Sequence, residues 1–68
     1  MVDLWKYEYG GKVKIVDIDE NIFMGEVLEV TDKDERSEEK GQEIGITVEI
    51  DGALIEFLQS DIKVIESI

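Results

Sequence analysis

Acidic side chains are the residues of this sequence whose types and spacing come nearest to a chemical site. Asp17, Asp19 and Asn21 stand at alternate positions, as the first oxygen ligands of a helix–loop–helix calcium loop do. Such a loop has glycine at its sixth position and a bidentate glutamate at its twelfth, but Ile22 and Leu28 stand there. The flanking residues also alternate as strands do. We therefore expect an acidic turn, with no resident metal.

A second acidic run covers Asp32–Glu43. Asp32, Asp34 and Glu43 fit ligand positions of the same kind of loop, whereas Arg36 stands where an oxygen ligand belongs. The segment Thr31–Gln42 has no apolar residue, which predicts a solvated connection between strands. Weak and unspecific binding of divalent cations by this segment is the alternative.

Catalytic chemistry has little support in the composition. The chain has no histidine, so Ser37, Ser60 and Ser67 have no imidazole base to activate them. It also has no cysteine, which excludes disulfides and thiolate metal sites. No carboxylate lies within a long apolar stretch that would raise its pKa for acid catalysis. We predict a protein that is not an enzyme and needs no cofactor.

The net charge of −11 comes from 18 acidic and 7 basic residues. Such a surface repels phosphate backbones and disfavours binding to nucleic acid. Hydrophobic residues make up 43% of the chain and fall in short regular runs, so we expect a folded domain. The first ten residues lack the pattern of a secretory signal, and no apolar run approaches the roughly 20 residues of a spanning helix. We expect one soluble, cytoplasmic domain over residues 1–68, with no membrane contact.

Short segments of alternating apolar and polar residues predict a mainly β fold. Gly25 inside the second segment predicts a bulge or sharp bend of the kind that small barrels need. Asp51-Gly52 predicts a tight hairpin turn, and Asp19-Glu20-Asn21 predicts a polar turn in which Asn21 tolerates a positive φ. The predicted fold is a strongly bent five-stranded barrel with a short N-terminal helical or extended segment. Its strands are expected at Lys12–Ile18, Ile22–Val30, Glu43–Ile50, Ala53–Leu58 and Ile62–Ile68.

Three aromatic residues, Trp5, Tyr7 and Tyr9, precede the first strand. Trp5 and Tyr9 are four residues apart and would share a face of a helical turn. We expect these aromatic side chains to plug the open end of the barrel. The alternative is a stacking platform for RNA, helped by Lys12 and Lys14 on the adjacent strand.

Several apolar side chains lie on the strand faces opposite the expected core. One small barrel cannot bury both faces of its strands, so bulges must turn some of them inward or a partner must cover them. We expect a homo-oligomer, or contact with another protein, through Val16, Ile18, Leu28, Leu54, Leu58 and Val64.

Two segments resemble the motifs of Sm-like (LSM) proteins. The sequence Gly-Lys-Val-Lys-Ile followed after a turn by Ile-Phe-Met-Gly-Glu-Val (Ile22 to Val27) is similar to their first motif. The sequence from Ile55 to Ile65 is similar to the strand–turn–strand of their second motif, although SH3-like barrels share this strand spacing. The resemblance implies a bent five-stranded barrel with a short helical start, often assembled into rings by edge-strand pairing.

The residues that hold a base in that family are missing here. By spacing from Gly25 they would fall near Lys33 and Glu35, and the family's Arg-Gly would fall at Leu58-Gln59. We therefore expect a binding or self-assembly module that acts without catalysis. An RNA-binding protein with a rearranged site is the second hypothesis, and an acidic mimic of nucleic acid is the third.

Overall fold

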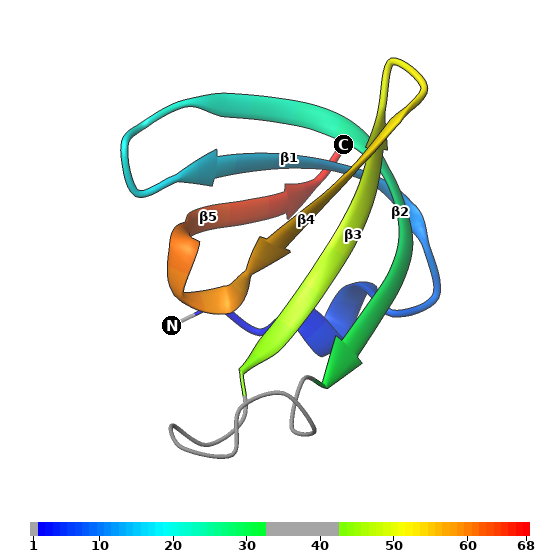
Figure 1. Ribbon diagram of the computed structural model, residues 1–68, viewed down its shortest axis with the longest axis horizontal. Coiled ribbons are helices and arrows are strands. Elements are labelled where there is room, and N and C mark those ends of the chain that lie inside the picture. The colour runs from blue at the N-terminus through cyan, green and yellow to red at the C-terminus, as the bar shows by residue number, and fades with distance from the viewer. Residues whose placement is uncertain (1, 33–42) are drawn as a thin grey trace.

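The computed structural model describes residues 2–32 and 43–68, which form a mainly β domain (Figure 1). Five antiparallel strands make one sheet in the order β4-β3-β2-β1-β5, so the predicted β class and number of strands are confirmed. Two short 3₁₀ turns, η1 and η3, are the helical elements of the described residues. The elements are η1 (Leu4–Tyr7), β1 (Gly11–Asp17), β2 (Ile22–Asp32), β3 (Ile44–Ile50), β4 (Ala53–Leu58), η3 (Gln59–Asp61) and β5 (Ile62–Ser67).

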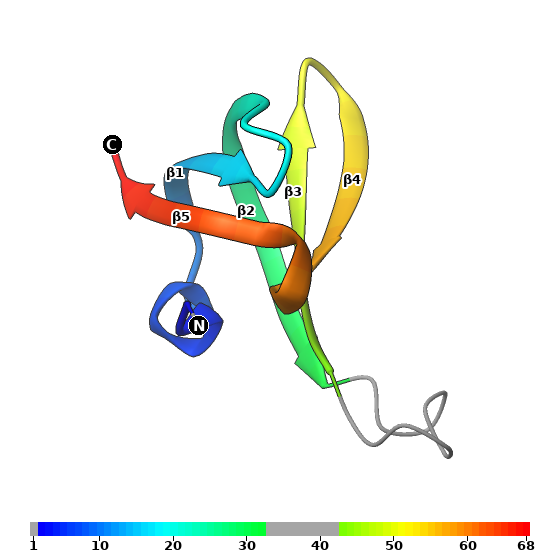
Figure 2. The same ribbon diagram turned by 90° about the vertical axis from the view of Figure 1, so that its left-hand side faces the viewer.

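The sheet curves strongly but does not close into a barrel, as the two views show (Figures 1 and 2). β4 and β5 lie at its two ends and do not pair with each other. Each of these strands therefore has one side whose backbone groups are not used within the sheet. The predicted connection from Thr31 to Gln42 falls largely outside the described residues, apart from Thr31 and Asp32 at the end of β2.

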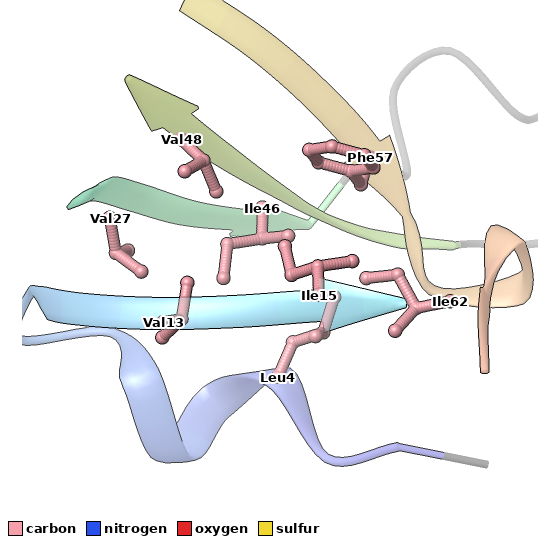
Figure 3. Close-up of a cluster of buried hydrophobic side chains, with 8 residues drawn as sticks. All are labelled: Leu4, Val13, Ile15, Val27, Ile46, Val48, Phe57 and Ile62. Atoms are coloured by element: carbon pink, nitrogen blue, oxygen red, sulfur yellow. The ribbon is translucent and has the colours of Figure 1, made fainter. Parts of the chain in front are cut away.

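Alternate residues of the strands fill one hydrophobic core inside the curve (Figure 3). The alternation expected for the third and fourth strands is confirmed, since Ile46, Val48 and Phe57 are buried and Ile55 packs against them. Phe23 meets Phe57 edge to face, with ring centroids 5.1 Å apart. The buried cluster consists of Leu4, Val13, Ile15, Val27, Ile46, Val48, Phe57 and Ile62.

A β-bulge at Leu28 changes which side chains of β2 face the core. Val27 pairs with Val48 and Glu29 pairs with Thr47, so Leu28 has no partner in the register. Simple alternation predicts that Leu28 and Val30 share the outer face. Instead Leu28 is exposed while Val30 packs against the core, because the extra residue shifts the alternation by one. The expectation for Val30 was wrong for this reason.

At Gly25 the backbone of β3 lies unusually close to its neighbour β2. A Cβ atom on Gly25 would lie 2.3 Å from the Glu49 carbonyl oxygen and 2.7–2.8 Å from side-chain carbons of Ile50 and Val48. Only glycine permits this approach of two backbones. The predicted role of Gly25 in bending the second strand agrees with this close contact.

Two turns use residues with positive φ. Asp51 and Gly52 have φ values of 52° and 85° and join Ile50 to Ala53, which confirms the predicted two-residue hairpin. In the first turn Glu20, and not Asn21, has the positive φ, at 69°. Asn21 instead uses its side chain and backbone to bond to Asp17.

The N-terminal segment closes the core in a way that differs from the expectation. Asp3 caps η1 by accepting a hydrogen bond from the Trp5 backbone N–H at 3.2 Å. Leu4 is fully buried, whereas 41% of Trp5 and 93% of Tyr9 are exposed. The plug is therefore one leucine, helped by the partly buried Tyr7, because a 3₁₀ turn puts residues three apart on one face.

Candidate functional site

The outer face of the sheet, away from the core, has a contiguous group of apolar side chains. Val16 on β1 is paired with Ile22 on β2 and with Val64 on β5. Met24 is two residues beyond Ile22 and so lies on the same face. The exposed fractions are 60% for Ile22, 56% for Met24 and 43% for Val64, while Val16 is half-buried between its neighbours. We call Val16, Ile22, Met24 and Val64 the apolar patch.

The two edges of the sheet have further exposed aliphatic side chains. Leu54 on β4 is 64% exposed, and Ile68, which follows β5, is 62% exposed. Their register neighbours form one row across the outer face: Leu54 pairs with Glu49, Glu49 with Glu26, and Glu26 with Lys12. The Ile68 backbone N–H completes the row by donating to the Lys12 carbonyl oxygen at 3.0 Å. The row thus ends in an aliphatic side chain at each edge.

Six side chains were expected from the sequence to contact a partner. Ile18, Leu28, Leu54 and Val64 are exposed, and Val16 and Leu58 are half-buried. The structure brings Val16 and Val64 together, while Leu54 and Leu58 lie on β4 and Leu28 lies at the bulge of β2. Sequence reasoning left Ile22 and Met24 out of this set, although their alternation with Phe23 places them on the outer face.

The aromatic and basic side chains of the RNA hypothesis do not form one open surface. The Tyr7 hydroxyl donates to the Ile65 carbonyl oxygen at 3.3 Å, which ties this ring to the core. The Lys14 ammonium lies 3.6 Å from the Glu66 carboxylate. Trp5, Tyr9 and Lys12 remain exposed. Two of the three predicted stacking rings and one of the two lysines are therefore open to solvent.

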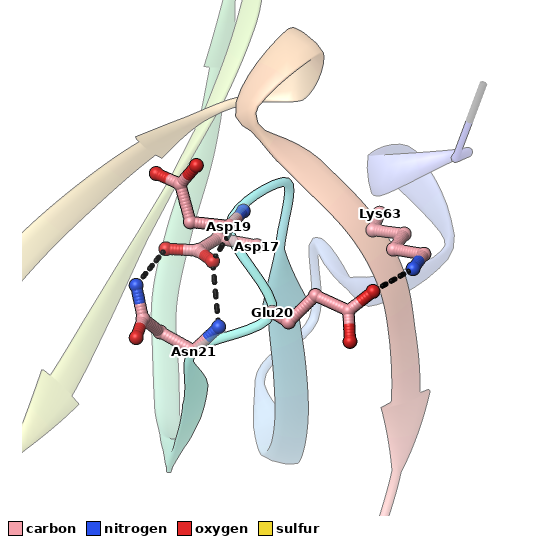
Figure 4. Close-up of polar contacts among 5 residues, drawn as sticks. All are labelled: Asp17, Asp19, Glu20, Asn21 and Lys63. Carbon is pink, nitrogen blue, oxygen red and sulfur yellow. Dashed lines mark hydrogen bonds and ion pairs between the residues drawn. The ribbon is translucent and has the colours of Figure 1, made fainter.

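The acidic turn after β1 is organised by the carboxylate of Asp17 (Figure 4). One oxygen accepts backbone N–H groups from Asp19 at 2.9 Å and Asn21 at 2.8 Å. The other oxygen accepts the Asn21 side-chain N–H at 3.2 Å. Hydrogen-bond donors therefore occupy the oxygens that a cation would need. In the described part of the chain, no group of three or more acidic side chains is arranged to hold a metal ion.

These hydrogen bonds predict a pH dependence of folding. The Asn21 backbone N–H, aided by the Asn21 side chain and the Asp19 N–H, lowers the pKa of Asp17 below its usual value. The stability that Asp17 contributes is complete above an unfolded pKa of about 3.9 and is lost as the pH falls through the lower folded pKa. Replacing Asp17 by Asn removes the titration but keeps most of the size of the side chain.

We expect the stability difference between the wild type and Asp17→Asn to be largest near neutral pH and to shrink below pH ~4. Urea unfolding across this range, followed by circular dichroism, measures the difference. Because both proteins contain the other carboxylates, their titration largely cancels in the comparison. A difference that stays constant down to the lowest pH would contradict the role of Asp17.

The other resolved pKa shifts also favour ionised carboxylates. Lys63 donates a hydrogen bond to Glu20 at 2.5 Å and lowers its pKa. Hydrogen bonds from Ser60 lower the pKa of Glu43. An open hollow of about 360 Å³ lies beside the bend at Gly25 and is lined in part by Lys12, Glu26 and Glu49.

Comparison of the chain with models of known protein families, with curated proteins and with solved structures finds no match. The described residues contain no helix with the length and apolar character needed to cross a bilayer.

Proposed function

We propose that the protein is a non-enzymatic module with a strongly bent, open Sm-like sheet, and that it assembles with copies of itself. The sheet order, the short helical start and the bend of β2 at Gly25 support an open, Sm-like curvature. The sequence resemblance over both motifs points in the same direction. Exposed aliphatic side chains, rather than a cleft with reactive groups, are the feature that needs a biological explanation.

The observation that carries this proposal is the pair of free edges. β4 and β5 end the same sheet, and each has unpaired backbone groups beside an exposed aliphatic side chain. In the proposed contact, β4 of one copy lies along β5 of the next, and Leu54 is covered by Ile68 of that copy. Because two different edges meet in this contact, each copy can bind a further copy. The row of copies closes into a ring when the rotation between neighbouring copies permits it.

The charge distribution sets the conditions for this assembly. A chain with net charge −11 repels its copies, and added salt screens that repulsion over about 10 Å at 0.1 M. Burial of aliphatic surface supplies the favourable free energy, roughly 25 cal/mol per Å². Association is therefore strongest at moderate salt, in contrast to RNA binding, which weakens as salt is added.

Leu54→Asp tests the edge contact. A charge at the centre of a buried contact is expected to cost about 2–4 kcal/mol of association, which is a rise of roughly 30-fold or more in the dissociation constant. Light scattering coupled to size-exclusion chromatography measures the mass over a dilution series. Circular dichroism should be unchanged, because Leu54 is 64% exposed in the single chain.

Leu54→Met is the matched control, because it keeps an apolar side chain of similar volume and is expected to retain the assembly. The edge contact is wrong if Leu54→Asp keeps the wild-type mass at every concentration. It is also wrong if the wild type is a monomer throughout the series.

A further inference from the structure

The apolar patch is too far into the sheet for edge pairing to cover it. Ile22 and Met24 belong to β2, which has β1 on one side and β3 on the other. A strand added beyond β4 or β5 extends the sheet sideways and leaves the outer face of β2 open to water. The exposure of Ile22 and Met24 therefore needs a cover that lies on the face of the sheet.

The charges around the patch differ from those of the rest of the protein. Two of the four lysines in the described residues border the patch, since Lys14 is the register partner of Met24 and Lys63 precedes Val64 on β5. Both form ion pairs with glutamates. Lys14 pairs with Glu66 at 3.6 Å and Lys63 with Glu20 at 2.5 Å, while Lys12 is the register partner of Glu26. These two ion pairs are neutral, in a chain whose net charge is −11.

The opposite half of the sheet is acidic without compensation. From Glu43 to Ile62, which covers β3, β4 and η3, the sequence has no lysine or arginine. Glu26 and Glu49 are also directly opposite each other in the register, which places two like charges side by side at the boundary. A basic partner would be drawn to that half of the molecule, whereas a second acidic copy meets the least repulsion at the neutral patch.

We infer that two copies of this chain pack face to face through the apolar patch. Each copy presents the same four apolar side chains, which suits a two-fold contact in which one surface meets its own copy. The lysine–glutamate pairs then form a rim of mixed sign around a dry centre, as is usual at protein interfaces. This contact is independent of the proposed edge contact and uses a different surface of the sheet.

Ile22→Lys tests the face contact, because it places a charge at the centre of the patch. The substitution also reduces the net negative charge, so any loss of association cannot come from added repulsion. The dissociation constant is expected to rise roughly tenfold or more, and the mass measured by light scattering to fall to roughly half at a fixed concentration. Tyr9→Lys is the control, because it makes the same charge change on a side chain that is 93% exposed.

Comparison with Leu54→Asp separates the two contacts. If the edge contact is absent, Leu54→Asp leaves the mass unchanged while Ile22→Lys still dissociates a dimer. The face contact is overturned if folded Ile22→Lys keeps the wild-type mass, whether or not Leu54→Asp dissociates. It is also overturned if Tyr9→Lys lowers the mass equally.

A second measurement serves if Ile22→Lys fails to fold. Light and heavy isotope-labelled wild-type proteins are mixed and treated with a zero-length carbodiimide cross-linker. Links between Lys14 of one copy and Glu26 of another support the face contact, because both residues lie on strands inside the sheet. If Lys14 links to acids of its own copy alone, the face contact is overturned.

Discussion

Gly25→Ala is expected to remove a large part of the stability of the fold. The new methyl carbon would lie 2.3 Å from the Glu49 carbonyl oxygen, which belongs to the backbone of β3 and cannot rotate away. Overpacking a core costs about 1–3 kcal/mol when side chains can adjust. Because backbone must move here, we expect about 3 kcal/mol or more.

That cost is large for a domain of this size. At 0.05–0.15 kcal/mol per residue, 68 residues correspond to a total stability of roughly 3–10 kcal/mol. Urea unfolding followed by circular dichroism measures the loss as a fall in the midpoint. Glu26→Ala is the neighbouring control, and we expect a change within about 0.5 kcal/mol, because Glu26 is exposed on the outer face. Equal midpoints for Gly25→Ala and the wild type would show that β3 does not press on β2 at this point.

Gly25 also shows what can be inferred from a sequence of this kind. A glycine within an alternating strand indicates a bend, since a residue without a side chain has little other use there. Alternation also places Ile46 and Val48 on one face of the third strand and Phe57 on one face of the fourth, and all three are buried. Local periodicity was sufficient at these positions because each strand has the core on one side and water on the other.

The same reasoning failed where β-bulges shift the alternation of inward and outward side chains. The extra residue at Leu28 turns Val30 toward the core, and a second irregularity near Val16 leaves Lys63 without a register partner on β1. A bulge is determined by how two strands twist against each other, so the sequence of one strand does not reveal it. The apolar patch was also only partly foreseen, because its members come from three strands whose register appears only in the folded structure.

The N-terminal segment packs with a periodicity that differs from the one expected from its sequence. Spacing by α-helical turns groups Trp5 with Tyr9, whereas the 3₁₀ turn groups Leu4 with Tyr7 and directs them inward. Leu4 is fully buried and makes contact with a core built from all five strands. The side chain closes the part of the core that the open sheet leaves uncovered (Figure 3).

Leu4→Ala is therefore expected to cost about 2–5 kcal/mol, because it removes buried methyl groups and leaves a cavity at the open side of the sheet. Tyr9→Ala removes a much larger side chain but should change stability by about 0.5 kcal/mol at most, since Tyr9 is 93% exposed. Urea midpoints of the two variants, followed by Trp5 fluorescence, make the comparison. If Tyr9→Ala lowers the midpoint as much as Leu4→Ala, the exposed ring contributes to the fold and the single-leucine plug is wrong. If only Leu4→Ala does so, η1 is a structural part of the core, and the exposed ring of Tyr9 needs no role in folding.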